Sequence, residues 1–524
     1  MALLLEWPTL VLTIFSAVFI GFYFYFTRNF NFWKNLGVPY VKPSPFVGNL
    51  KECVLLKETI GNHLKNLYDE HSDKPYVGIF SFDKPSLLVR DPKLLKNILV
   101  KDSKFFADHI MSVDVKSDPV FGNSLFVLKG QRWREVRVNM TPIFTSGRMK
   151  NMFYLVVLGC KELIELLDKE TAKGSPVQVK ETMTRYTTDV IASCAFGIQS
   201  NTLKNPYSEF RDHLREVFDF TVRKGLTNLL AFFAPSLKSI LRLKLLDNST
   251  ADYIRKLIWS TVEYREKTGL IRKDILHWIN ELRTNGKKTV QDATVSAENP
   301  RIDSKFQLDD DEFVAQAFQI LAGGFETSGT TMSFALYELA LHPDIQHRLR
   351  EEITRVMAKH QGELTYEGMQ EMSYLDMVVS ETLRKYPVLP FLDRMCGSDY
   401  TLPSTSGNGT VLLPKGTGVF IPVFALHYDP QYYPDPDKFD PERFTEENKQ
   451  NRPNYTYLPF GEGPRICIGM RFGLMQVKVG LSHILSRFEV APCKDTPLTV
   501  VYDRKSFILS MDGEIPLSFK RIPI

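Results

Sequence analysis

A short glycine-rich loop around one cysteine constrains the fold of this chain more than any other feature. Residues 460–469 read FGEGPRICIG, which places three glycines and a proline around Cys467. Gly461, Gly463 and Gly469 allow backbone conformations that are closed to other residues, and they let the main chain approach a large flat ligand. A helical pattern follows, so the cysteine lies near a helix N-terminus whose amide groups stabilise a thiolate. The pattern favours a cysteine presented to a ligand over a buried structural cysteine.

Charge and cysteine content exclude several classes of protein. The 524 residues carry 65 basic and 61 acidic side chains, a balance too even to indicate nucleic-acid binding. The six cysteines form no CxxC pair, so neither a disulfide framework nor a zinc knuckle is predicted. With 44% hydrophobic residues the chain is predicted to be globular, and its length is compatible with one large domain after a short leader.

The chain begins with an apolar segment that predicts a membrane anchor. Residues 7–26 carry no charge and as a helix would span ~30 Å, the thickness of the hydrocarbon core. A cleaved signal peptide is the alternative, but Glu6 and the aromatic end of the segment do not fit one. Arg28 and Lys34 follow the span, so the positive-inside rule places the remainder of the chain in the cytosol.

A proline-rich stretch follows the anchor. Pro39, Pro43 and Pro45 disfavour both a helix and a central strand, which predicts a stiff extended hinge. The chain is therefore predicted to divide into three parts: a membrane anchor (1–27), a hinge (28–50) and a catalytic domain (51–524).

The catalytic domain is predicted to be mainly α with a small β region. Amphipathic patterns predict long helices over residues 149–170 and 311–341, whereas strand-like runs occupy 75–90 and 506–519. The polar stretch 283–310 lacks apolar periodicity and is predicted to be a surface loop.

The cysteine loop resembles that of one family. Phe460, Gly463, Arg465, Cys467 and Gly469 match the cytochrome P450 pattern FxxGxRxCxG at every fixed position. The resemblance implies the cytochrome P450 fold and haem b as cofactor, with the cysteine as the axial iron ligand. A thiolate ligand pushes electron density toward the iron and favours O–O cleavage, which is monooxygenase chemistry.

Further matches imply residues that bind the haem carboxylates. Trp133 and Arg137 stand four apart, so both can donate to one carboxylate from a single helical face. Arg394 and Arg465 resemble the other arginines that bind haem propionates in the family. His109 stands where relatives commonly carry an arginine that reaches a propionate. Alone, residues 133–137 would be read as a solvated helix face.

A third match concerns the scaffold behind the cysteine. Glu381 and Arg384 are spaced i, i+3 and can pair on one helix. The resemblance implies a network of this pair with Arg443, and a structural role for all three.

The helix predicted over 311–341 carries a motif resembling the oxygen-activation site of the family. Its glycines, including Gly323, would open a groove over the iron, and Thr327 with Glu326 would relay protons to the oxygen being reduced. For Thr327 alone, the alternative is a hydrogen bond from its hydroxyl to the carbonyl four residues earlier.

No Rossmann fingerprint, P-loop or flavin motif occurs, so electrons from NADPH must arrive through another protein. The resemblance implies a separate NADPH-cytochrome P450 reductase, sometimes with cytochrome b5, and residence in the endoplasmic reticulum membrane. Basic residues near the haem motifs can form a docking face for an acidic partner: Lys129, Arg132, Arg134, Arg148, Lys150 and Lys478.

The substrate is predicted to be lipophilic, because the segments that line the pocket in the family are apolar and aromatic here. The implied pocket residues are Phe318, Ala322, Val388, Leu389, Phe391 and Phe507. The GGFETS motif and the segment 142–153 resemble insect microsomal family-6 enzymes, which largely oxidise foreign compounds such as plant toxins and insecticides. Oxidation of an endogenous hormone or fatty acid is an alternative. A haem-binding carrier or sensor is another, but it would not need Glu326 and Thr327.

Overall fold

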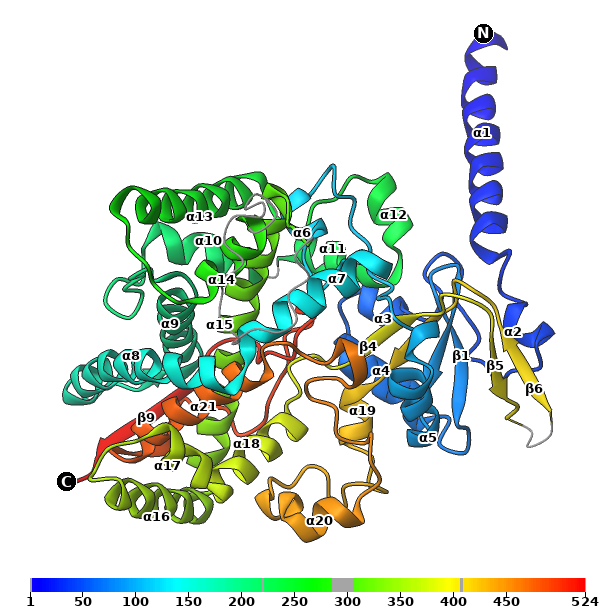
Figure 1. Ribbon diagram of the computed structural model, residues 1–524. Helices are drawn as coiled ribbons and strands as arrows, with labels where there is room; N and C mark the ends of the chain where they lie inside the picture. The colour runs from blue at the N-terminus through cyan, green and yellow to red at the C-terminus, as the bar shows by residue number, and fades with distance from the viewer. Residues whose placement is uncertain (1, 219–220, 285–305, 406–408, 524) are drawn as a thin grey trace.

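The computed structural model describes residues 2–218, 221–284, 306–405 and 409–523. The first helix, α1 (Ala2–Thr27), projects from the body of the molecule (Figure 1). Within the described residues, Trp7–Asn35 is the one helical span long and apolar enough to cross a membrane, and its most apolar 18-residue stretch has no buried residue. This arrangement agrees with the predicted anchor.

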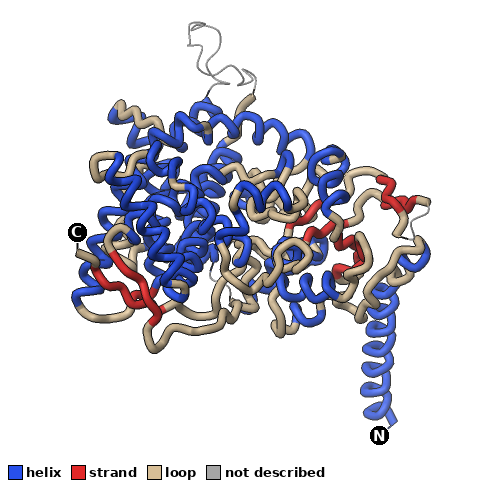
Figure 2. Tube along the Cα trace, turned by 90° about the horizontal axis from the view of Figure 1, so that it is seen from below, coloured by secondary structure: helices blue, strands red, loops and turns tan. Residues whose placement is uncertain are grey.

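The strands form small sheets at separate places in the body. A four-stranded sheet has the order β1-β2-β7-β4, in which β2 and β7 are parallel and the other pairs antiparallel. Figure 2 shows the three-stranded sheet β3-β9-β8 on the opposite side of the body from the anchor. The strands are β1 (Tyr76–Ser81), β2 (Lys84–Val89), β3 (Val177–Gln178), β4 (Leu392–Met395), β5 (Tyr400–Pro403), β6 (Thr410–Leu413), β7 (Gly418–Ile421), β8 (Phe488–Pro492) and β9 (Pro516–Arg521).

The two predicted strand regions have different outcomes. Residues 75–90 form the hairpin β1-β2, as predicted. Of residues 506–519, only those from Pro516 onward form a strand. The earlier part turns back, because the Leu509 N–H donates to the Val388 carbonyl (2.8 Å) instead of joining a sheet.

The predicted hinge packs against the body. It contains the short helix α2 (Phe32–Asn35), whose Trp33 is fully buried and donates from Nε1 to the Ile79 carbonyl (3.0 Å). Farther on, the Pro39 carbonyl accepts a hydrogen bond from the Gly78 N–H of β1 (2.8 Å). The stretch is fixed to the edge of the four-stranded sheet, and it is not extended throughout, because Ser44 and Gly48 close a turn around Pro45 with two backbone hydrogen bonds (2.8 and 2.9 Å).

Helices make up most of the body, as the sequence predicts. The predicted helix 149–170 is α8 (Ser146–Ala172). The other helices are α3 (Lys51–Val54), α4 (Ile60–Asp69), α5 (Pro92–Lys96), α6 (Pro119–Gly122), α7 (Gly130–Met140), α9 (Val179–Ile191), α10 (Glu209–Phe218), α11 (Val222–Phe233), α12 (Pro235–Ile240), α13 (Asn248–Thr268), α14 (Ile275–Thr284), α15 (Asp310–Leu341), α16 (Pro343–Lys359), α17 (Tyr366–Glu371), α18 (Ser373–Lys385), α19 (Val423–His427), α20 (Glu446–Asn451) and α21 (Met470–Leu485).

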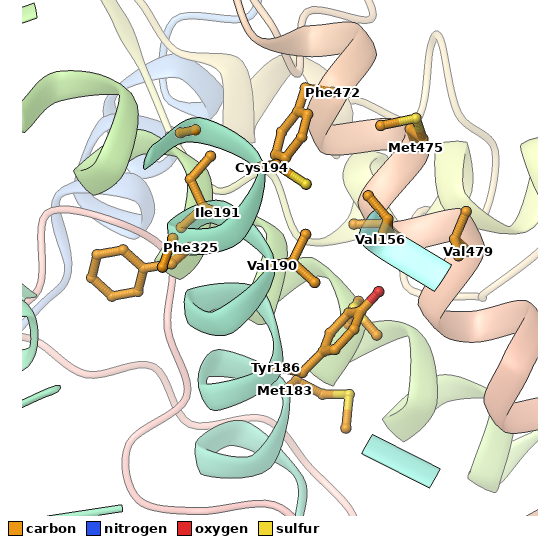
Figure 3. Close-up of a cluster of buried hydrophobic side chains, with 14 of the residues drawn as sticks. Val156, Met183, Tyr186, Val190, Ile191, Cys194, Phe325, Phe472, Met475 and Val479 are labelled. Atoms are coloured by element: carbon orange, nitrogen blue, oxygen red, sulfur yellow. The ribbon is translucent and has the colours of Figure 1, made fainter. Parts of the chain in front are cut away.

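Helix α15 runs through the core and organises the site. Its start is a capping box, in which the Glu312 N–H donates to the Asp309 carboxylate (2.7 Å) and the Asp309 N–H to the Glu312 carboxylate (3.1 Å). It ends before Pro343, which begins α16. Helices α9 and α21 pack along it, and Figure 3 shows the side chains of α9 between those of α15 and α21. Of the predicted loop 283–310, residues 285–305 lie outside the described residues.

Candidate active site

The backbone of the cysteine loop is held by a hydrogen bond and by glycine geometry. The Cys467 N–H donates to the Phe460 carbonyl (2.9 Å), which closes the loop ahead of α21. Gly461 (φ +73°) and Gly463 (φ +74°) adopt left-handed conformations. A Cβ on Gly463 would overlap the carbonyl oxygen of Leu99, so this position also needs glycine for lack of space.

The Cys467 thiol faces open space inside the protein. Its side chain is exposed, yet burial raises the pKa of the thiol, so protein surrounds it while leaving one direction open. Three groups act against this effect of burial. The backbone N–H groups of Gly469 and Met470 lower the pKa of the thiol, and so does the positive charge of Arg137. These groups favour the thiolate form, as expected near a helix N-terminus.

Arg465 anchors the cysteine loop to the segment before α7. Its guanidinium donates to the carbonyls of Ala107 (2.7 Å), Leu125 (3.3 Å) and Leu128 (2.9 Å), and to the Asp108 carboxylate (3.3 Å). It also lies over the Trp133 ring at 3.8 Å. Burial lowers the pKa of Arg465 to about 9, although Asp108 acts in the opposite direction. These hydrogen bonds hold the cysteine loop against residues 107–128, a structural role that the sequence motif did not indicate for Arg465.

Three of the predicted haem-binding side chains keep N–H groups that could donate hydrogen bonds to a bound cofactor: Trp133, Arg137 and Arg394. Among the described residues, the side chains of Arg137 and Trp133 donate no hydrogen bond, and buried Arg394 donates one, to the Asp393 carbonyl (2.7 Å). Burial lowers the pKa of Arg394 to about 10 and lowers that of Arg137 as well. Free guanidinium N–H groups beside an inward-facing thiol fit a flat cofactor that carries carboxylates, as a haem does.

His109 lies in the same cluster and pairs with Asp393. Its Nδ1 is 2.8 Å from the Asp393 carboxylate, which also accepts from the Ile110 N–H (2.6 Å). Burial lowers the pKa of His109 despite this carboxylate, so the ring is neutral at neutral pH. The ring stacks on Phe126 with centroids 4.7 Å apart. His109 therefore orients Asp393 next to Arg394.

The scaffold behind the cysteine forms the network that the sequence predicts. Arg384 and Glu381 are fully buried and joined by two hydrogen bonds of 2.7 and 2.8 Å. The Asp440 N–H donates to Glu381 (2.9 Å), and the Arg443 guanidinium lies 3.5 Å from the same carboxylate. The structure thus brings the three predicted residues together.

His427 belongs to this scaffold, and the sequence did not single it out. Its Nδ1 is 3.1 Å from the Arg384 carbonyl, and its Nε2 accepts a hydrogen bond from the Leu458 N–H (2.9 Å). Burial lowers the pKa of His427 to about 3, so the imidazole is neutral and connects α18 to the segment leading into the cysteine loop. The only signal in the sequence was a lone histidine in an apolar stretch, which has no distinguishing spacing.

The adjacent glycines of α15 have different roles. Gly323 is exposed although it lies in the middle of a core helix, and a Cβ there would meet nothing within 4 Å. A Cβ on Gly324 would lie 2.6 Å from Ile191 of α9. Figure 3 shows Ile191 beside Phe325. Gly323 therefore provides the predicted opening, whereas Gly324 allows close packing of α9.

Thr327 and Glu326 follow on the next turn. The Thr327 hydroxyl donates to the Gly323 carbonyl (2.8 Å), which is the alternative considered for a threonine within a helix. The hydroxyl oxygen can still accept a hydrogen bond from an added group. Burial raises the pKa of Glu326, and Arg211 of α10 is the main group that lowers it. This carboxyl can therefore hold or release a proton.

Two of the six predicted pocket residues lie against one aromatic side chain of α11. Phe232 lies 5.5 Å from Phe391 and 5.6 Å from Phe507 between ring centroids. Val388 and Leu389 pack in the cluster of residues around Phe507. The sequence analysis missed Phe232, because no motif marks α11.

The remaining two predicted pocket residues are on α15. Phe318 and Ala322 are buried, and Phe318 contacts Phe121 of α6 at 6.2 Å between ring centroids. None of the six predicted residues lines the cavity of about 720 Å³ that lies between α1, α12 and the β1-β2 turn.

Comparison with known proteins agrees with this site. The cytochrome P450 family model matches residues 38–515. The chain is 49% identical to cytochrome P450 6j1 of Blattella germanica over 511 residues, which cover 98% of this chain and 97% of the relative. It is 43% identical to cytochrome P450 6k1 of the same insect over 511 residues (97% and 96%), and 39% identical to cytochrome P450 6a2 of Drosophila melanogaster over 500 residues (94% and 96%). The chain therefore belongs to the cytochrome P450 family.

Proposed function

We propose that this monooxygenase oxidises lipophilic foreign compounds, with Cys467 as the axial ligand of its haem. Membership of the family implies a haem-thiolate cofactor and monooxygenase activity. The observation that carries the assignment is the exposed Cys467 thiol in its glycine loop, with the positive charge of Arg137 acting on it. The apolar, aromatic surroundings of Phe232 and the similarity to insect family-6 enzymes support the substrate class.

The residues of this chain have separate tasks in the proposed reaction. A bound haem would supply the iron centre at which O2 is activated. Arg137, Arg394 and Trp133 would hold its carboxylates, and the thiolate of Cys467 would bind the iron. On α15, Thr327 and Glu326 would deliver the two protons that the reduction of one oxygen atom to water requires, with two electrons from the reductase, while the other oxygen atom enters the substrate.

Electrons reach the enzyme from a separate reductase, and we propose that this partner docks near α7. The basic residues predicted for this face are partly neutralised within the protein: Arg132 pairs with Glu312, Lys150 with Glu367, and Lys478 with Asp376. Arg134 is exposed and makes no ion pair with the described residues. It is therefore the cation most available to an acidic surface.

We also propose that the anchor holds the enzyme in the endoplasmic reticulum membrane with residues 28–524 in the cytosol. The helix α1 is suited to span the membrane, and Arg28 follows it directly. Arg28 pairs with Asp83 in the β1-β2 turn (2.7 Å), which ties the end of the anchor to the body.

The substrate class is tested by turnover in membranes that contain the reductase. A panel of plant toxins and insecticides is compared with a panel of steroids and fatty acids, and products carrying one added oxygen atom are measured by mass spectrometry. We expect turnover mainly in the first panel, and Phe232→Ala to change the product distribution. Phe488→Ala, in the three-stranded sheet, is the control. Turnover confined to steroids or fatty acids would overturn the proposed substrate class.

A further inference from the structure

Arg211 of α10 is a buried cation with unused donors. Its side chain is 4% exposed, and Nη2 donates to the Glu181 carboxylate of α9 (3.0 Å). Its Nε and Nη1 are buried and have no hydrogen-bond partner in the part of the chain that the structure describes. Buried guanidinium N–H groups without partners are costly, so such groups ordinarily bind water.

The face of α10 that carries Arg211 is turned toward α15. Phe218 follows Arg211 by seven residues, which is two helical turns, so both lie on one face of the helix. Phe218 contacts Phe325 edge-to-face, with ring centroids 5.3 Å apart. Phe325 directly precedes Glu326, whose carboxylate accepts no hydrogen bond from the described residues. The unused donors of Arg211 and the free carboxylate of Glu326 therefore belong to the same helix interface.

The other end of this cluster reaches solvent. The Glu181 side chain is 31% exposed, and its backbone N–H donates to the Glu514 carboxylate (3.3 Å). Lys180 donates to the carbonyls of Met511 (2.9 Å) and Gly513 (3.3 Å). Lys180, Glu181, Arg211 and Glu514 are also the charged groups that act on Glu326. The Glu181–Arg211 pair thus joins a partly exposed carboxylate to a buried guanidinium on α10, a helix that packs against α15.

We propose that Glu181 and Arg211 form the route by which protons from solvent reach Glu326. Glu181 is the surface end and exchanges protons with bulk water. Water molecules bound by the two free N–H groups of Arg211 carry the proton to the Glu326 carboxylate, which passes it on toward Thr327. Arg211 keeps all its protons throughout, since a guanidinium does not act as an acid in proteins. It is a positioning residue.

This inference rests on the proposed roles of Glu326 and Thr327, and two substitutions separate it from a purely electrostatic effect. Arg211→Gln removes a positive charge that lowers the pKa of the Glu326 carboxyl, so this pKa should rise. Glu181→Gln removes a negative charge and should lower it. If the residues act only through charge, the two variants should change proton delivery in opposite directions. If they form the route, both should impair it.

The experiment uses the full-length haem enzyme in membranes with reductase. Infrared titration of the substrate-free ferric protein gives the pKa of the Glu326 carboxyl, assigned by the loss of its band in Glu326→Gln. Product formed per NADPH consumed, together with the solvent deuterium isotope effect, reports proton delivery. We expect opposite pKa shifts, a several-fold lower product yield in both variants, and partial rescue in Arg211→Lys.

Matched controls are available in the same chain. Glu162 is 34% exposed and paired with Lys204, so Glu162→Gln reproduces the surface change at Glu181. Arg265 is paired with buried Asp274, so Arg265→Gln reproduces the loss of a buried guanidinium. A product yield in Glu181→Gln equal to that in Glu162→Gln would overturn the proposed route. A wild-type product yield in Glu326→Gln would instead show that Glu326 does not deliver protons. The proposed function of Glu326 would then be wrong, and Glu181 and Arg211 would have no proton acceptor to serve.

Discussion

The two sides of the site differ in how completely their polar groups are paired. On the cysteine side, Glu381 and Arg384 are joined by two hydrogen bonds, both nitrogens of His427 have partners, and Arg465 makes four hydrogen bonds. The oxygen side comprises α15 around Gly323 with α9 and α10. Among the described residues, the N–H groups at Nε and Nη1 of buried Arg211 have no acceptor there, and Glu326 accepts no hydrogen bond.

This difference corresponds to two tasks. A metal ligand must be held in one geometry, and a paired, buried network fixes its surroundings. A site that binds oxygen, moves protons and admits varied substrates needs space and groups that can change partners. We therefore expect substitutions on the cysteine side to act mainly on stability, and those on the oxygen side mainly on coupling.

The largest effect is expected for Glu381→Ala. It leaves Arg384 buried and unpaired, which should lower the free energy of unfolding by about 3–5 kcal/mol. Urea unfolding of the haem-loaded protein measures the loss. The control is Arg348→Ala, which breaks the exposed Arg348–Glu442 pair and should cost about 0–1 kcal/mol. Equal losses in the two variants would contradict the assigned importance of the buried network.

His427 should make the cysteine side sensitive to acid. Its pKa is about 3 in the folded protein and near 6.5 when unfolded, so the unfolded state binds the proton first as the pH falls. The contribution of the neutral His427 ring to the free energy of unfolding is therefore fully present above pH 6.5. It decreases as the pH falls from 6.5 toward 3. Between pH 6.5 and 5 the decline is about 2 kcal/mol, at about 1.4 kcal/mol per unit.

His427→Gln removes this titration. Urea unfolding of wild type and variant at pH 6.5 and at pH 5 should therefore show that the difference between their free energies of unfolding is about 2 kcal/mol smaller at pH 5. A difference that stays constant would show that the His427 ring is not held neutral.

Two glycines of the cysteine loop should differ in their tolerance of alanine. Gly463→Ala meets the Leu99 carbonyl at a left-handed backbone position and should cost about 1–3 kcal/mol. Gly469→Ala has open space and an ordinary negative φ of −89°, so its effect on unfolding should be smaller. The reverse order in thermal unfolding would exclude this account of the loop.

The smallest effect on stability is expected for Thr327→Ala. The variant loses one hydrogen bond to the Gly323 carbonyl within the helix, so unfolding should change by less than about 1 kcal/mol. Its product yield per NADPH should nevertheless fall, with more peroxide released. Thr327→Ser, which keeps the hydroxyl, is the control. Wild-type coupling in Thr327→Ala would remove the proton-relay role.

The sequence predicted the features that depend on local spacing. The cysteine loop, the i, i+3 pair of Glu381 and Arg384, and the two ends of α15 all follow from neighbouring residues. It could not reveal His427, whose partners are backbone atoms 43 and 31 residues away. Nor could it distinguish Gly323 from Gly324, because the difference is created by Ile191 on another helix.

Hydrogen bonds between distant segments also lay beyond sequence reasoning. The family resemblance predicts that Arg465 binds a propionate, and the fold adds hydrogen bonds from this arginine to carbonyls between residues 107 and 128. Such contacts depend on how distant segments meet, so they become visible only in the structure.

The carbon monoxide difference spectrum of the reduced protein tests the central claim, that Cys467 is the thiolate ligand of the haem. The wild type should show the strongly red-shifted absorption band typical of a thiolate-bound haem–carbon monoxide complex. Cys467→His should retain haem but lose that band. Absence of the band in correctly folded, haem-loaded wild type, or its persistence in Cys467→His, would contradict the account.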